Sequence, residues 1–216
     1  MKISLPCIIG VCAALTAVTA NAQQSRFYVR GDVGAQLTSD TDLEEFFGPV
    51  AGGSDVEFDT GIRLGIAGGY QVTDWFAAEV ESAIMASELK SITGANDVDA
   101  VFSNVPFLIN ARFQLPNRSP LTPYIGAGVG FSVASLDVER INLNGLSIDG
   151  YESDAVFACQ AFAGLRYALN DQMGLSLEYH YFATDEPSWD ADYISGKIGF
   201  GRMETHALSV AFDYKF

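Results

Sequence analysis

Apolar and polar residues alternate with a period of two in eight separate runs of this chain, and no other feature constrains its fold as strongly. In the clearest run, which covers residues 104–115, Val105, Phe107 and Ile109 share one face while Asn104 and Asn110 lie on the other. The other runs begin near residues 27, 61, 76, 124, 160, 175 and 208. A period of two is that of a β-strand, whereas a helix repeats at about 3.6 residues. The chain is therefore predicted to be all-β, with eight strands of about ten residues.

The connections between these runs alternate in length. Short ones fall near residues 72–74, 116–122 and 170–172, and long ones span about 37–59, 87–100, 137–154 and 183–204. An antiparallel up-and-down barrel with short turns at one rim and long loops at the other has this rhythm. No stretch after residue 22 is apolar over the roughly 18 residues of a membrane-spanning helix, so a membrane location requires a closed barrel.

Alternating strands suit both a soluble lipid-binding barrel, such as a lipocalin, and a transmembrane barrel, and the two differ in which face points inward. Glycines recur on the polar face, for example Gly65, Gly126 and Gly164, and small residues are needed where an eight-stranded barrel is most crowded, which is inside. Aromatic side chains lie near the ends of the apolar face, as in the girdles of a bilayer-spanning barrel. They are Tyr70, Trp75, Tyr167, Tyr179, Tyr181 and Tyr214. Both features favour a polar interior.

The charges on the polar face of the strands and turns balance, with seven acidic against seven basic residues. A buried ion-pair network requires such a balance, because an unpaired interior charge costs several kcal/mol. The sequence therefore predicts an interior network of ion pairs, within which the His180 side chain is also hydrogen-bonded. The residues assigned to this network are Arg30, Asp32, Arg63, Glu79, Glu81, Arg112, Arg166, Glu178, His180, Asp213 and Lys215.

The N-terminus has the pattern of an export signal. Met1 and Lys2 precede an apolar run from residue 3 to residue 18, and small residues follow up to Ala22. One positive charge, a short apolar core and an Ala-x-Ala site are typical of a secretory signal peptide, whereas a bilayer-spanning helix needs roughly 20 apolar residues. We predict residues 1–22 as a signal peptide, cleaved between Ala22 and Gln23, and residues 23–216 as one barrel domain.

Four stretches, Thr122–Gly130, Ala163–Tyr167, Ser176–Tyr181 and Leu208–Phe216, occur in order along the chain. With them the sequence resembles the eight-stranded outer-membrane β-barrel family of Gram-negative bacteria, which includes the OmpA-like transmembrane domain and small porin-like proteins. The resemblance implies an eight-stranded antiparallel up-and-down transmembrane β-barrel in the bacterial outer membrane. Tyr214 and Phe216 resemble the terminal signal that the barrel-assembly machinery reads. We expect no wall anchoring, because the periplasmic peptidoglycan-binding domain of full-length OmpA is absent after Phe216.

The net charge of −15, from 12 basic and 27 acidic residues, argues against nucleic-acid binding, which needs a basic face. Twenty of the acidic residues fall in the four long connections, together with only Lys90, Arg140, Lys197 and Arg202. The simplest interpretation is a solvated, self-repelling set of external loops; the alternative is a site for divalent cations next to lipopolysaccharide phosphates. Three Asp-x-Asp pairs, at residues 40–42, 97–99 and 190–192, lack the spacing of a calcium loop. We predict no metal and no cofactor.

Catalysis is the remaining alternative, because some small outer-membrane barrels modify lipid A as deacylases or palmitoyl transferases. The chain has two histidines, His180 and His206, and Ser176 precedes His180 by four residues on the same face. His180 also shares that face with Glu178, which suits a hydrogen-bonded interior residue. His206 opens the last run near the long-loop rim. No recognisable deacylase arrangement results, and we predict that the protein is not an enzyme.

Two function classes therefore remain. The preferred one is a monomeric structural or surface-interaction barrel, surrounded by outer-membrane lipid and lipopolysaccharide and closed inside by its ionic network. The alternative is a narrow pore for ions or small polar solutes. Eight strands leave an interior that side chains just fill, which argues against a wide channel, although the lumen-facing glycines leave room for a narrow water path.

Overall fold

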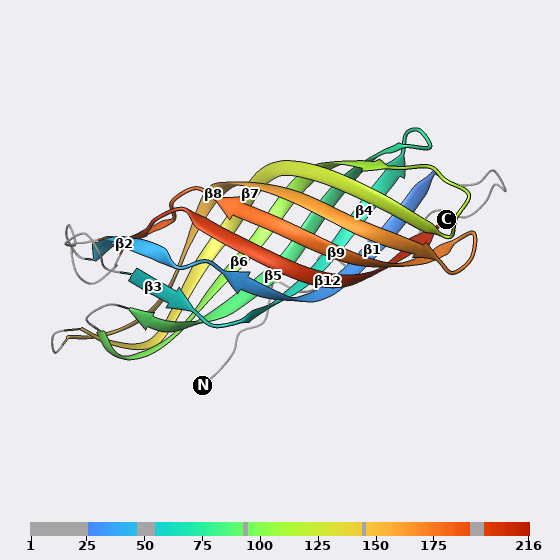
Figure 1. The fold of residues 1–216 in the computed structure, drawn as a ribbon. Coiled ribbons are helices and arrows are strands. Elements are labelled where there is room, and N and C mark those ends of the chain that lie inside the picture. Colours follow the sequence, from blue (N-terminus) through green and yellow to red (C-terminus); the bar gives the residue numbers. More distant parts are fainter. Residues whose placement is uncertain (1–25, 47–54, 93–94, 144–145, 191–196) are drawn as a thin grey trace.

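The computed structural model describes residues 26–46, 55–92, 95–143, 146–190 and 197–216, and they form a closed β-barrel (Figure 1). Within these ranges, no helix is long and apolar enough to cross a membrane. Eight strands build the wall of the barrel. They are β1 (Phe27–Thr38), β4 (Gly61–Gln71), β5 (Phe76–Ile92), β6 (Ala95–Gln114), β7 (Leu121–Leu143), β8 (Leu146–Ala168), β9 (Met173–Thr184) and β12 (Met203–Lys215).

Each of these strands pairs antiparallel with its two neighbours along the chain, and β1 pairs with β12 to close the barrel. The register keeps residues of one face side by side, as in the pairs Val33↔Val210 and Ile109↔Val129. The prediction of an eight-stranded antiparallel up-and-down barrel is therefore confirmed. Residues 1–25 lie outside the described residues, and so do the predicted signal peptide and its cleavage site at Ala22 and Gln23.

Four short strands extend the wall at one end, on the left in Figure 1, where β2 and β3 are labelled. They are β2 (Thr41–Phe46), β3 (Asp55–Phe58), β10 (Ser188–Asp190) and β11 (Lys197–Phe200). They pair in the order β10–β11–β2–β3–β5, so they continue the sheet beyond the ends of β1, β4, β9 and β12. The opposite end carries the short turns and the C-terminus (Figure 1).

The prediction of long loops at 87–100 and 137–154 is wrong. Strand β5 continues to Ile92 and β6 begins at Ala95. Likewise, β7 continues to Leu143 and β8 begins at Leu146. At about 3.3 Å per residue and a tilt near 40°, the 23 residues of β7 reach roughly 58 Å along the barrel axis, more than twice the apolar band of about 25 Å in such barrels. A large part of the barrel therefore stands outside the bilayer.

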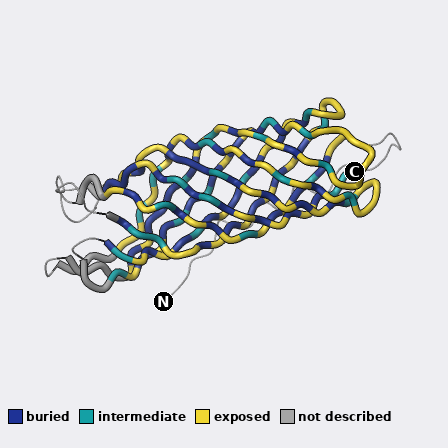
Figure 2. The backbone as a smooth tube through the Cα atoms, in the orientation of Figure 1, coloured by how far each residue is buried: buried dark blue, intermediate teal, exposed yellow. Residues whose placement is uncertain are grey.

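In the part of the barrel nearer the short turns, apolar side chains point outward and polar ones point inward. Along β7, Ile125, Val129 and Phe131 are more than half exposed, whereas Ser132 is fully buried. Figure 2 shows the resulting alternation of exposed and buried residues along every long strand. An apolar outer surface around a polar interior is the arrangement of a bilayer-spanning barrel, not of a lipocalin.

The same strands reverse this polarity nearer the end formed by β2 and β3. Along β7, the outward residues become Asp137 and Glu139, both exposed, while Leu136 and Val138 are buried inside. The inward side chains there form one apolar cluster: Val56, Leu89, Ile92, Ala100, Phe102, Ala134, Leu136, Val138, Val156, Phe200 and Met203. A polar surface over an apolar core is the pattern of a water-soluble protein, so the reversal marks where the barrel leaves the bilayer.

Two of the short turns are closed by asparagine side chains. The Oδ1 atom of Asn170 accepts hydrogen bonds from the backbone N–H groups of Gln172 and Met173 at 2.9 and 2.8 Å. The Oδ1 atom of Asn117 accepts one from the N–H of Ser119 at 2.8 Å. Asparagine favours such turns because its side chain replaces a backbone acceptor locally.

Candidate functional site in the barrel interior

Arg30, on β1, lies at the centre of the interior and contacts three carboxylates. Its guanidinium forms ion pairs with Glu178 at 2.5 Å, Glu79 at 3.2 Å and Glu81 at 3.3 Å. All four side chains are almost completely buried. Glu79 and Glu81 lie on β5 and Glu178 lies on β9, and these strands are two positions from β1 on either side. Arg30 therefore links strands that share no backbone hydrogen bonds.

Glu81 collects donors from four other strands. Besides Arg30, it pairs with Arg63 of β4, and it accepts hydrogen bonds from the side-chain amides of Asn110 on β6 and Gln160 on β8, at 2.6 and 2.9 Å. Arg63 also pairs with Asp32 at 3.0 Å. A buried carboxylate is tolerated when charged donors and hydrogen bonds satisfy its oxygens, and Glu81 meets that condition.

Two tyrosine hydroxyls complete this set of contacts. Tyr28 donates to Glu79 at 2.5 Å, and Tyr124 donates to Glu178. Arg112 pairs with Glu79 at 3.3 Å, and its guanidinium lies 3.8 Å from the centre of the Tyr124 ring. The ring face of a tyrosine attracts a cation, so Tyr124 contacts Arg112 and Glu178 at once.

Four residues that make these contacts are absent from the network predicted from the sequence: Tyr28, Asn110, Tyr124 and Gln160. Each lies at an inward position in the alternating pattern of its strand, and this position is the sequence signal that could have identified it as an interior residue. Polar or charged inward residues of this central group are named together as the central network. They are Tyr28, Arg30, Asp32, Arg63, Glu79, Glu81, Asn110, Arg112, Tyr124, Gln160, Glu178 and His180.

The remaining three residues assigned from the sequence form a second group near the short turns. Arg166 donates two hydrogen bonds to Asp213, at 2.8 and 2.6 Å, through its Nε and Nη2 atoms. Lys215 lies two residues farther along β12 and is half-buried. Among the described residues, no ion pair joins this group to a carboxylate of the central network.

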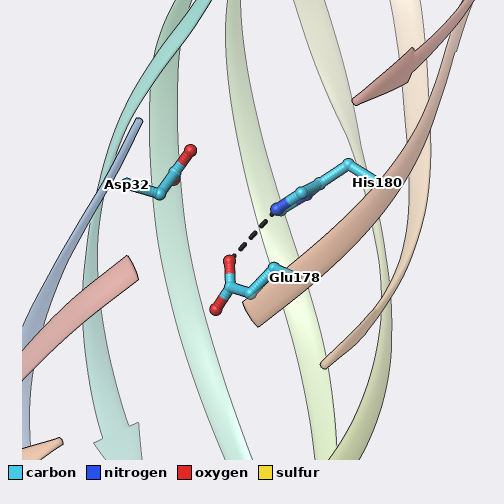
Figure 3. A group of neighbouring side chains, drawn as sticks. All are labelled: Asp32, Glu178 and His180. Atoms are coloured by element: carbon cyan, nitrogen blue, oxygen red, sulfur yellow. Dashed lines mark hydrogen bonds and ion pairs between the residues drawn. The ribbon is translucent and has the colours of Figure 1, made fainter. Parts of the chain in front are cut away.

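His180 lies inside the barrel and is completely buried. Its Nε2 atom is 3.1 Å from Glu178 Oε2 (Figure 3). Its ring stacks on Phe162 with a centroid distance of 5.7 Å. Ser176 is also buried, on the same strand and face. The wall of the barrel separates both residues from the lipid outside. This position does not suit attack on a lipid A acyl chain.

Asp32, Glu178 and His180 bring possible metal-ligand atoms within 4.8 Å of one another (Figure 3). Each carboxylate already faces a guanidinium, since Arg63 contacts Asp32 at 3.0 Å and Arg30 contacts Glu178 at 2.5 Å. A divalent cation placed among them would meet two fixed positive charges. Electrostatics therefore disfavours a metal centre at this position.

The network is packed against glycines of neighbouring strands. A Cβ atom on Gly65 would overlap the carboxylate of Asp32, and one on Gly126 would overlap the ring of Phe162. Because these glycines have no side chain, they leave the space that the large interior side chains occupy. This is the physical reason for small residues on the inward face.

The last residues of the chain close the barrel at the short-turn end. The rings of Tyr214 and Phe216 meet edge to face, with centroids 5.4 Å apart, and the N–H of Phe216 donates to the backbone oxygen of Phe27. Near the other end of the lipid-facing surface, His206 Nδ1 is 2.7 Å from the hydroxyl of Tyr179. His206 therefore lies in the aromatic outer surface, away from the interior carboxylates.

Outside the bilayer level, one exposed ion pair joins the neighbouring strands β3 and β5. Lys90 Nζ lies 3.1 Å from Glu57 Oε2. Hydrogen bonds from Lys90 and then Ser91 lower the pKa of the Glu57 carboxyl below its usual value, and the same pair raises the pKa of Lys90. Both groups are exposed, so water screens their attraction and the pair adds little to stability.

The sequence profile of the outer membrane protein beta-barrel domain matches residues 7–216. Proteins of Brucella abortus (strain 2308) and Brucella suis biovar 1 (strain 1330), both described as uncharacterized, are 29% identical to this chain over 190 residues. The matches cover 72% of this chain and 66% of each relative, so the chain spans just under two thirds of their length.

Three solved structures resemble the barrel. OprG from Pseudomonas aeruginosa has a TM-score of 0.59 and 17% identity, over 89% of this chain and 96% of its own. Neisserial surface protein A has a TM-score of 0.55 and 19% identity, over 89% and 98%. AlkL has a TM-score of 0.55 and 16% identity, over 100% and 97%. At these identities the likeness shows a common fold.

Proposed function

Since the chain belongs to the outer membrane protein β-barrel domain family and is thus a bacterial outer-membrane protein, we propose that it is a structural and surface-interaction barrel with a closed lumen. The observation that supports this most is the central network, in which Arg30 and Arg63 join carboxylates from four other positions across the interior. Side chains that are ion-paired across the lumen leave no wide path for a solute.

The part of the barrel outside the bilayer supports the interaction role. Its strands hold an apolar core of their own, in which Phe102 lies 5.8 Å from Phe58 and 6.5 Å from Phe200, centroid to centroid. Such a core makes the extension a rigid platform rather than a set of loose loops. Its outer surface carries acidic residues such as Glu88, Asp99 and Asp137. We propose that the partners are the surrounding lipid and lipopolysaccharide and a ligand at this exposed end.

We further propose that the protein is a monomer that the barrel-assembly machinery inserts through Tyr214 and Phe216, and that it has no enzymatic activity. Non-catalytic function is supported by the position of His180 and Ser176 inside the lumen, where lipid does not reach them.

Single-channel conductance of the refolded full-length protein in planar bilayers tests the closed lumen. We expect no discrete steps from the wild-type barrel. Arg112→Ala removes a guanidinium that is 4% exposed and contacts Glu79, so this variant is expected to conduct. Arg118→Ala, in an exposed turn, is the matched control and should remain silent. Regular steps from the wild-type barrel would reject the closed lumen.

A narrow pore is the second candidate, and a specific observation favours it. Several buried polar atoms within the described interior have no protein partner, including Arg30 Nε, Gln160 Oε1 and His180 Nδ1. Buried polar atoms of this kind usually hydrogen-bond to water. A thread of water through the network would carry small ions, and reproducible wild-type steps of low conductance would support this candidate.

A further inference from the structure

A small polar cavity lies inside the barrel at the end with the short turns. Its volume is about 60 Å³, compared with the roughly 10–15 Å³ that a single water needs, and strands from around the barrel line it. The basic members of its lining are Arg112, Arg166 and Lys215. The neutral hydrogen-bonding members are Gln71, Gln114, Thr122 and Tyr28, and the Tyr28 hydroxyl already donates to Glu79. We name it the mouth cavity.

Positive charge exceeds negative charge in the mouth cavity. Asp213 is the one carboxylate in its lining, and the two hydrogen bonds from Arg166 already satisfy it. Lys215 makes no ion pair within 4.0 Å among the described residues. Arg112 shares Glu79 with Arg30, at 3.3 and 3.2 Å, and Glu79 also accepts a hydrogen bond from Tyr28. Arg112 and Arg166 therefore each have a carboxylate partner, and Lys215 is the basic residue of the lining that has none among the described residues.

A second observation independently indicates a missing acceptor. The Nε atom of Arg112, a residue that is only 4% exposed, is buried and has no hydrogen-bond partner among the described protein residues. A buried donor without an acceptor costs roughly 1–3 kcal/mol. The guanidinium lies 3.8 Å from the centre of the Tyr124 ring and pairs with Glu79, and both contacts restrict its rotation. A ligand with several acceptor oxygens would satisfy donors of this kind.

We propose that the mouth cavity binds a small free oxyanion, of the phosphate class, from the periplasm. Arg112 and Lys215 would supply the charge, and the amides of Gln71 and Gln114 and the hydroxyl of Thr122 would supply neutral donors. Phosphate oxygens accept charge-assisted hydrogen bonds from guanidinium and ammonium groups, which are stronger than neutral ones.

Access to the cavity determines the source of the anion. Gln71, Gln114, Thr122 and Lys215 are partly exposed, whereas Arg112 is buried. The cavity thus becomes wetter toward the short turns, which in outer-membrane barrels face the periplasm. The cavity is lined by inward-facing residues of the strands and opens toward this mouth, so the proposal commits to an ion dissolved in the periplasm. This inference is independent of whether the lumen conducts.

The test is isothermal titration of the full-length protein, refolded in octyl glucoside without phosphate buffer, with sodium phosphate at constant ionic strength. We expect saturable binding of one phosphate per barrel, at least tenfold tighter than chloride. Lys215→Gln should weaken it at least fivefold, and Lys90→Gln, which removes a lysine from the opposite end, should not change it. Equal binding of chloride and phosphate, or no saturation, would overturn the proposal.

A second measurement locates the site without relying on Lys215. The ¹⁵Nε resonance of Arg112 should shift as phosphate is added and should reach a plateau at the same concentration as the heat signal. Thr122→Val, at a partly exposed cavity position, should weaken binding in a barrel that still migrates as folded on an unheated gel. Phosphate affinity that is unchanged in both Lys215→Gln and Thr122→Val would place the anion elsewhere and reject the mouth cavity.

Discussion

The ring of Tyr124 lies directly over the backbone of Gly164, its cross-strand neighbour on β8, so that a Cβ atom on Gly164 would overlap the ring. Tyr28 and Gly69 repeat the arrangement between β1 and β4. Each tyrosine hydroxyl reaches a carboxylate of the central network from this position. The glycines thus determine where two of the network's donors lie.

Gly164→Ala should lower the free energy of unfolding by about 1–3 kcal/mol, because the added methyl group pushes Tyr124 away from Glu178. Urea unfolding in micelles, followed by tryptophan fluorescence, measures the change. Gly68→Ala is the matched control, since a Cβ there meets nothing within 4 Å. Equal effects of the two substitutions would contradict the packing role of Gly164.

Arg30→Met should destabilise the barrel by roughly 3–5 kcal/mol, because it leaves Glu178 and its neighbours buried without their shared cation. Replacing Glu178 by Gln in the same chain removes one of the uncompensated charges. We therefore expect the double variant Arg30→Met, Glu178→Gln to recover at least about 1 kcal/mol relative to additivity. Strictly additive unfolding energies would show that the two residues are not coupled.

Phe102→Ala should loosen the barrel outside the bilayer and leave the membrane level intact. The substitution opens a cavity in the apolar cluster, where such truncations cost about 3–5 kcal/mol. Hydrogen exchange should accelerate for β6 amides before Asn104 and stay slow for those at 107–113. Val101→Ala, at the exposed neighbouring position, should leave both sets of amides protected.

The Glu57–Lys90 ion pair should be detectable in a titration of the Glu57 carboxyl, whereas its effect on the free energy of unfolding should be small. The pKa of Glu57 is lowered in the folded barrel, so its contribution to stability is present above the usual carboxyl pKa and is lost as the pH falls. Carboxyl-carbon NMR should give a midpoint below that of an ordinary glutamate. Lys90→Gln should return the midpoint toward the ordinary value, because the largest cause of the shift is the Lys90 hydrogen bond. An unshifted midpoint in the wild type would contradict the pair.

The sequence determined the barrel because alternation is a local property of each strand. At the membrane level, the positions of Arg30, Glu81 and Glu178 in the alternating pattern place all three on the inward face. Because the charges on that face balance and the lumen is closed, basic side chains are expected to lie near carboxylates. Beyond the membrane level the apolar residues of β7 change to the inward face. A pattern defined by outward apolar residues therefore predicts a loop at 137–154, although Leu136 and Val138 continue the period of two on the opposite face.

Only the tertiary structure decided which inward residues meet. Arg30 pairs with carboxylates two strands away on both sides, and the distances between such positions depend on strand stagger, which alternation does not specify. The uneven distribution of charge is also a tertiary property. The charges that balance over the whole polar face are unevenly placed in the barrel: Arg112, Arg166 and Lys215 all line the cavity at the short-turn end, where Asp213 is the only carboxylate among the described lining residues. Local pattern fixes the face of a residue, and barrel closure fixes its partners.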